Sequence, residues 1–181
     1  MLGGILSLLA LAGCAGSPSA APAASAAVGS PVAAPSPAPD DDALGRVAII
    51  HGGAGPWAVA GYRMGAYALA RLGLERQSFD LEVVHHTPQK VQFSCIADGA
   101  AAATGASAGK LNLRLVDAAD ADVATTFRRR STGQSVTLRP SRAFAARFAD
   151  LPRDQLAAAG RAVLALPDAE VFEEVPAPAG P

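Results

Sequence analysis

Two residues far apart in the sequence, Cys95 and His51, carry side chains that could do thiol or metal chemistry. A thiolate ligates soft metals and attacks electrophiles, and an imidazole serves as metal ligand or general base. The chain has 2 cysteines, and lipid attachment to Cys14, argued below, would leave Cys95 as the remaining thiol. A leftover cysteine in an exported protein indicates a reactive thiol, a metal ligand or an intermolecular bond, and an inert buried thiol is the alternative.

The predicted surroundings of both residues favour a shared site. Ser94 can cap a helix over residues 95–103, and a helix N-terminus favours thiolate, so we expect the pKa of Cys95 below the usual ~8.5. His51 follows an apolar run, residues 46–50, that predicts a short strand, and it precedes a glycine-rich loop. A surface loop histidine is the alternative interpretation. If the two side chains converge, they suit Zn, Cu or Fe rather than Mg or Ca.

Three further polar residues are candidates for a supporting role at that site. His85 and His86 end a predicted strand over residues 79–85 and would point to opposite faces, so at most one can join a given site. Asp98 lies one turn after Cys95, where it could orient a ligand or a bound water, or be a surface charge. We assign no catalytic residue.

Residues 105–110 contain two glycines and a lysine, but they do not match the pattern of a phosphate-binding loop. This stretch is one residue short of the Walker pattern, and Leu111 stands where a Ser or Thr should hold magnesium. The formal net charge of -1 also gives no electrostatic case for nucleic acid as a partner.

The N-terminus has the pattern of an export signal. Residues 1–13 are apolar and too short to span a bilayer, which needs ~20 residues, and no Lys or Arg precedes the apolar run. Leu11-Ala12-Gly13-Cys14 resembles the bacterial lipobox. Residues 1–14 are therefore expected to be a lipoprotein signal peptide, with acyl chains such as palmitate on Cys14 and the protein anchored to the membrane on the periplasmic or outer side. An apolar stub with an ordinary buried Cys is the alternative.

The rest of the chain divides by composition. Residues 15–43 are rich in Ala and Pro and predict a disordered linker, because they cannot bury enough apolar surface. Residues 44–176 predict one folded domain, and residues 177–181 a tail. Helices are expected over residues 57–72, 141–148 and 153–166. Strands are expected over 111–116 and 171–175, and a hairpin over 123–129 and 135–139. Strands and helices do not alternate strictly, so we expect an α+β fold with a mixed or antiparallel sheet.

Several ordered sequence blocks resemble the FmdE domain family, named after formylmethanofuran dehydrogenase, over about residues 47–175. The blocks are His51-Gly52-Gly53-Ala54-Gly55-Pro56, Gly61-Tyr62-Arg63-Met64-Gly65, His86-Thr87-Pro88, Ser94-Cys95-Ile96-Ala97-Asp98-Gly99, Thr104 to Leu113, Leu151-Pro152 and Asp168 to Val175. The resemblance implies a metal-associated site on His51 and Cys95, with Asp98 nearby. It gives no reason to transfer the dehydrogenase reaction, which belongs to separate catalytic polypeptides of that enzyme.

The sequence departs from the family pattern at several ligand positions. Gly53 stands where the family usually has a second His, Gly55 and Ala106 stand where many members have Cys, and the Cys-rich zinc-binding tail is absent. A tetrahedral zinc site needs four ligands, and His51 with Cys95 supplies two. We therefore expect weak binding of one transition metal ion, zinc being favoured, with positions open to water, to His86 or to a cargo ligand.

The prediction for function is a lipid-anchored binding protein that holds a transition metal, or a small ligand carrying one, through Cys95 and His51. One alternative is a thiol-dependent enzyme in which His51 is the base for Cys95. The other is a degenerate interaction module without metal. We expect the domain not to be catalytic on its own, and a homodimer is compatible with the sequence.

Overall fold

The computed structural model describes residues 39–177, so the predicted signal peptide, Cys14 and the predicted linker up to residue 38 lie outside the described residues. The helices are α1 (Pro39–His51), α2 (Pro56–Leu72), α3 (Val91–Thr104), α4 (Arg142–Phe148), α5 (Leu156–Ala165) and α6 (Asp168–Val171). The strands are β1 (Leu81–Thr87), β2 (Leu113–Asp117), β3 (Ala124–Arg129), β4 (Ser135–Pro140) and β5 (Phe172–Glu174). Short 3-10 turns are η1 (Ala108–Lys110), η2 (Asp120–Asp122) and η3 (Arg153–Gln155).

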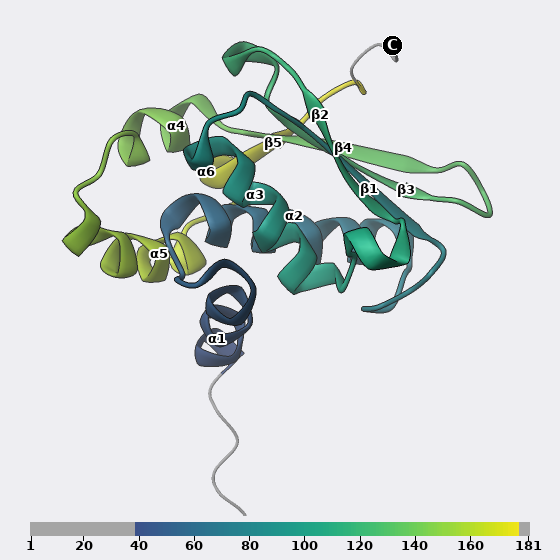
Figure 1. The fold of residues 1–181 in the computed structure, drawn as a ribbon, viewed down its shortest axis with the longest axis horizontal. Helices are drawn as coiled ribbons and strands as arrows, with labels where there is room; N and C mark the ends of the chain where they lie inside the picture. The colour runs from purple at the N-terminus through teal and green to yellow at the C-terminus, as the bar shows by residue number, and fades with distance from the viewer. Residues whose placement is uncertain (1–38, 178–181) are drawn as a thin grey trace, which may run out of the picture. The chain divides into compact units, whose positions relative to one another are not determined.

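The five strands form a mixed sheet in the order β2-β1-β3-β4-β5 (Figure 1). Strand β2 runs parallel to β1, and the other neighbouring pairs are antiparallel. The predicted hairpin is confirmed as β3 and β4, and Gly133 with φ 75° supplies the left-handed residue of its turn. The predicted α+β fold with a mixed sheet is confirmed.

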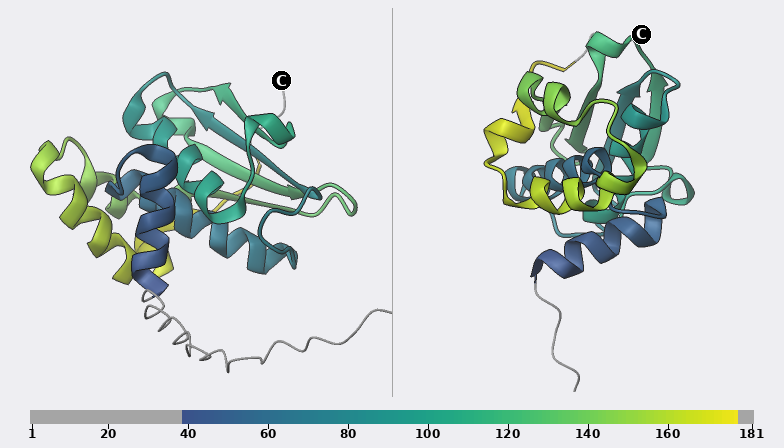
Figure 2. Two further views of the ribbon diagram at one scale, coloured as in Figure 1. Left: turned by 60° about the horizontal axis from the view of Figure 1, so that its bottom comes forward. Right: turned by 90° about the vertical axis from the view of Figure 1, so that its left-hand side faces the viewer.

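Helices α2 and α3 form the layer that positions the site, and they pack very closely against each other (Figure 2). A Cβ atom on Gly61 would lie 2.0 Å from the carbonyl oxygen of Ile96, and one on Gly99 would lie 1.8 Å from that of Ala58. Both positions must therefore be glycine for the two backbones to approach this closely. The α2 prediction is confirmed, with Pro56 in its first turn and Gly73 in the left-handed conformation at its end.

The two faces of the sheet have different chemistry because side chains alternate along each strand. One face joins the helices in a core whose large, fully buried side chains include Phe127, Met64, Leu81 and Leu138. The opposite face carries the ion pairs Arg114–Glu82, Arg128–Glu82 and Arg139–Glu173. We call this second face the polar face.

The strand predicted over residues 46–50 is wrong, because these residues form the end of helix α1. Val47 is buried together with Ala43, four residues earlier, whereas Ile49 is exposed, which is helical rather than alternating burial. An ion pair between Asp42 and Arg46 also links successive turns. A short apolar run does not distinguish a strand from a helix segment.

The helix predicted over residues 95–103 begins earlier, at Val91, and Lys90 occupies the N-cap position without a side-chain cap, so the predicted Ser94 cap is wrong. Its predicted end is confirmed, since Gly105 terminates it in the left-handed conformation. Ser141 caps α4 as predicted, accepting a hydrogen bond from the Phe144 amide. Within residues 39–177, no helix is both long enough and apolar enough to cross a membrane.

Candidate functional site

Cys95 and His51 lie on different helices and line the same pocket, which has a volume of about 340 Å³. His51 is the last residue of α1, and Cys95 lies on α3. The expectation that His51 follows a strand is therefore wrong, but both residues line one pocket, as a shared site requires. The pocket is lined by His51, Gly55, Pro56, Trp57, Val91, Gln92, Cys95, Phe148, Asp150, Leu151 and Leu156. We call it the thiol pocket.

His51 is oriented by a carboxylate from the neighbouring helix. Its Nδ1 lies 2.8 Å from Oδ2 of Asp98, and both side chains are partly exposed. Because a carboxylate only accepts, Nδ1 carries the proton, and the lone pair of a neutral ring is then on Nε2. Asp98 follows Cys95 by one turn of α3, so one helix supplies both the thiol and the group that orients the imidazole.

The thiol of Cys95 is buried and protonated in this arrangement. The residue is 8% exposed, and its Sγ donates to the carbonyl oxygen of Gln92 at 3.1 Å. Burial raises the pKa of Cys95 to about 12, with a smaller contribution from the negative charge of Asp98. The expected lowering of this pKa is wrong, because α3 begins at Val91 and places Cys95 beyond the first turn, where the field of the helix terminus has faded.

His85 lies on the helix-facing side of β1, and both of its ring nitrogens are hydrogen-bonded. Its Nε2 lies 3.1 Å from the Phe93 carbonyl oxygen, and its Nδ1 lies 2.9 Å from the Thr125 hydroxyl. A carbonyl only accepts, so Nε2 is the donor and Nδ1 accepts from Thr125. Burial lowers the pKa of His85 to about 4, which keeps the ring neutral. This histidine connects strand and helix, and it has no nitrogen left for a metal.

His86 points the other way, to the polar face, where it lines a separate pocket. Its pKa is lowered by burial and by the positive charge of Arg114. The structure thus brings together His51, Cys95 and Asp98, and it separates His86 from them by the thickness of the sheet.

Sequence reasoning did not identify the other polar groups at the thiol pocket. Gln92 supplies the carbonyl that accepts from the thiol, and Asp150 stands at the pocket with the unusual φ of 49°. Trp57 forms one wall, with its indole N–H fixed by the Phe148 carbonyl at 2.9 Å. Nothing in the sequence around residues 92 or 150 signals these roles, because they follow from how α3 and the segment after α4 pack.

A closed metal site is not assembled by these residues. Within residues 39–177, no group of three or more His, Cys, Asp or Glu side chains is arranged to hold a metal ion. His51 Nε2 and Cys95 Sγ offer one borderline and one soft donor beside a largely apolar pocket. This donor set fits a metal that brings other ligands with it, and it does not fit a four-ligand structural zinc site.

The fold and the site define a small α+β domain with a thiol and a carboxylate-oriented imidazole at one pocket. A family model for FmdE, described as molybdenum formylmethanofuran dehydrogenase operon, matches residues 50–173. The chain therefore belongs to the FmdE family. A comparison with curated proteins finds no match.

Proposed function

We propose that this protein binds a soft transition metal ion, zinc being favoured, or a small ligand that carries one, through Cys95 and His51. The observation that supports the proposal is that His51 and Cys95 line one pocket, with the His51–Asp98 hydrogen bond at 2.8 Å beside it. Metal-binding histidines commonly donate their second nitrogen to a carboxylate, which fixes the ring and raises the basicity of the ligating nitrogen.

Because coordination positions remain open, the metal is better explained as something that the protein carries than as a structural ion that stabilises the fold. Gly53, Gly55 and Ala106 replace family ligands, and the pocket is walled by apolar side chains such as Trp57, Phe148 and Leu156. A ligand with an apolar portion and its own metal-binding atoms would fill the pocket and complete the coordination shell. Membership in the FmdE family supports a metal-associated role.

Metal binding at this site must release a proton. The high pKa of Cys95 means that the thiol is protonated at neutral pH, so the metal has to displace its proton on binding. At pH values below the pKa of Cys95, the metal affinity should rise about tenfold for each pH unit, because one proton is released for each metal ion bound.

A thiol enzyme is the second candidate, because the structure supplies the third partner of a Cys–His–Asp arrangement. Asp98 orients His51 as such a mechanism requires. However, the Cys95 thiol donates to the Gln92 carbonyl and is kept protonated by burial. A nucleophilic cysteine needs a lowered pKa, so metal binding, in which the ion itself drives deprotonation, is the better supported function.

Cobalt binding tests the proposal, because a cobalt–thiolate bond gives a near-ultraviolet charge-transfer band. We expect one Co²⁺ per chain, with the band present in the wild type and absent in Cys95→Ser. His51→Gln should weaken binding at least about tenfold. His86→Gln is the matched control, since it changes a histidine on the polar face and should leave binding unchanged. Absence of the band, or its persistence in Cys95→Ser, would refute the proposal.

We further propose that the domain is exported and held at the cell envelope by acyl chains on Cys14. The proposal is supported by Leu11-Ala12-Gly13-Cys14 and by the Pro-rich residues that follow. Cys14→Ala should move the protein from the membrane fraction to the soluble fraction. A wild-type protein that is already soluble and retains residues 1–13 would contradict the lipid anchor.

A further inference from the structure

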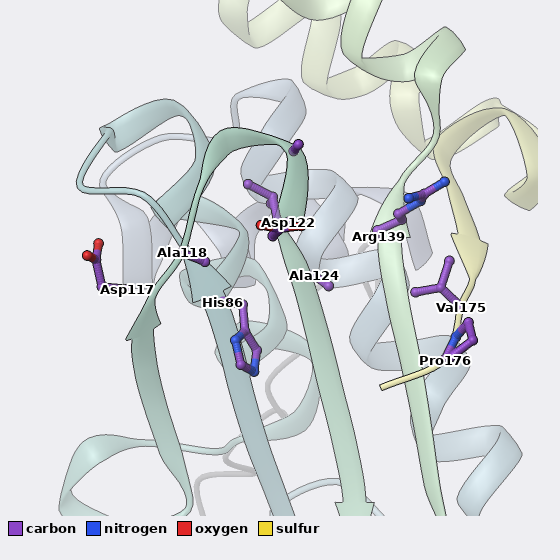
Figure 3. A pocket seen from close by; sticks show the side chains of 10 residues that line it. His86, Asp117, Ala118, Asp122, Ala124, Arg139, Val175 and Pro176 are labelled. Atoms are coloured by element: carbon purple, nitrogen blue, oxygen red, sulfur yellow. The ribbon is translucent and has the colours of Figure 1, made fainter. Parts of the chain in front are cut away.

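The polar face of the sheet contains a second pocket, of about 650 Å³, that the metal proposal does not use. Cross-strand register places His86 of β1 opposite Ala124 of β3. The β3–β4 register, continued by one residue, places Ala124 opposite Arg139 of β4, which in turn is opposite Glu173 of β5. These side chains therefore form one row across neighbouring strands on the polar face, and Figure 3 shows three of them, His86, Ala124 and Arg139.

The alanine in the middle of this row creates a recess. Adjacent strands are about 4.8 Å apart, so the Cα atoms of His86 and Arg139 are about 10 Å apart. Ala124 between them has only a methyl group and is buried at the pocket floor. The lining also includes the small apolar side chains of Ala118, Ala121 and Val175, together with Asp117, Val123 and Pro176. We call the space bounded by His86, Ala124, Arg139 and Asp122 the sheet recess.

Two nitrogen-bearing side chains flank the recess with donors to spare. Arg139 is held in place by its Nε, which donates to Glu173 at 2.7 Å, and its other N–H groups remain for a planar anion. The imidazole of His86 makes no hydrogen bond to any residue between 39 and 177. Neither group is needed by the core, which lies on the opposite face of the sheet.

An acidic group stands at a third side of the recess. Asp122 is the last residue of η2, and it lines the same pocket as Ala124 at the start of β3. Figure 3 shows Asp122 beyond the end of the Ala124 strand, whereas Asp117 points away from His86. The recess thus has the Arg139 guanidinium for a carboxylate on one side, an acceptor for an ammonium group on a second, and the His86 imidazole on a third.

We propose that the sheet recess binds a small zwitterion of about dipeptide size, with its carboxylate at Arg139 and its ammonium at Asp122. The spacing supports this size, because Arg139 and Asp122 are separated by one strand and two residues, which is about 8 Å between Cα atoms. The small apolar lining leaves room for short side chains between the two charged ends. The site is independent of Cys95 and His51.

Calorimetric titration of the full-length chain with L-alanyl-L-alanine tests the proposal. The matched probes are its N-acetyl form, which lacks the ammonium, and its C-terminal amide, which lacks the carboxylate. We expect the unmodified dipeptide to bind and each capped form to bind at least about tenfold more weakly, since each loses one charge-assisted contact. A capped form that binds as well as the dipeptide, or a dipeptide that does not bind at millimolar concentration, would overturn the proposal.

Two variants locate the binding in the recess. Ala124→Leu fills the space without removing any charge, and Arg139→Gln removes the carboxylate partner; each should weaken dipeptide binding at least about tenfold. Thr126→Leu and Arg128→Gln are the matched controls, since both lie on the same face of β3 and do not line the pocket. Equal binding by Ala124→Leu and the wild type would place the ligand elsewhere and refute the assignment.

Discussion

The thiol pocket and the sheet recess lie on opposite sides of one sheet. Their polar groups differ in how deeply they are buried and in how many partners fix them. In the thiol pocket, Cys95 is buried and protonated, and His51 is fixed by Asp98. In the sheet recess, His86 and Asp122 stand at an open, charged surface, and only Arg139 is anchored. Because side chains alternate along a strand, the adjacent residues His85 and His86 lie in different environments, one in the core and one on the polar face.

The largest effect on stability is expected for Gly99→Ala, because the added methyl group would push apart the two helices beside the thiol pocket. Gly99→Ala places a Cβ 1.8 Å from the Ala58 carbonyl oxygen, so α3 must move away from α2. We expect a loss of at least about 4 kcal/mol in the free energy of unfolding, measured by urea titration. Gly45→Ala is the control, because its Cβ would meet nothing within 4 Å and an exposed helical alanine should stabilise α1 by about 0.5–1 kcal/mol. Equal stabilities for the two variants would contradict the close packing.

The reactivity of Cys95 should be strongly suppressed by folding. A pKa of about 12, against an ordinary 9.0, leaves the folded protein with about a thousandfold less thiolate at pH 8, which corresponds to about 4 kcal/mol. Iodoacetamide labelling of Cys14→Ser, followed from pH 7 to pH 10, should be slow in the folded state and fast in urea. Fast labelling of the folded chain, with a titration midpoint near pH 8.5, would instead support the alternative that the protein is a thiol enzyme.

His85 should make the fold more sensitive to acid than His86, because only His85 is fully buried and its pKa is lowered to about 4. The folded-state pKa of His85 is lowered to about 4 from 6.5, so the unfolded chain binds the proton first as the pH falls. This histidine therefore costs no stability above pH 6.5, and about 3 kcal/mol is lost progressively as the pH falls from 6.5 to 4. Unfolding free energies measured at several pH values should show this loss in the wild type and in His86→Gln, and a loss smaller by about that amount in His85→Gln. Parallel pH profiles for all three proteins would contradict this assignment.

The smallest effect is expected at the hydrogen bond that orients His51. Asp98→Asn removes the carboxylate and should weaken cobalt binding about tenfold, less than Cys95→Ser, because the two direct ligands remain. Asp122→Asn makes the same isosteric change at the sheet recess and should leave cobalt binding unchanged. If both variants bind cobalt as the wild type does, Asp98 is only a surface charge.

The class of fold, several helices and one hairpin could be predicted from the sequence. Proline at the start of α2, glycine after α2 and α3, and the Ser141 cap are local signals that act within a few residues, so these helices and the β3–β4 hairpin could be predicted. Cys95 and His51 became candidates because each lies in a sequence block that resembles the FmdE family.

Only the tertiary structure decided how those residues behave. Residues 46–50 form helix rather than strand because Val47 is buried in a helical pattern, and a five-residue apolar run carries no period of its own. The pKa of Cys95 rises rather than falls because desolvation depends on neighbours distant in sequence and outweighs any effect of the helix terminus. His51 meets Asp98, and Arg139 comes into line with His86, through helix packing and strand pairing between segments 47 and 53 residues apart, which no local pattern encodes.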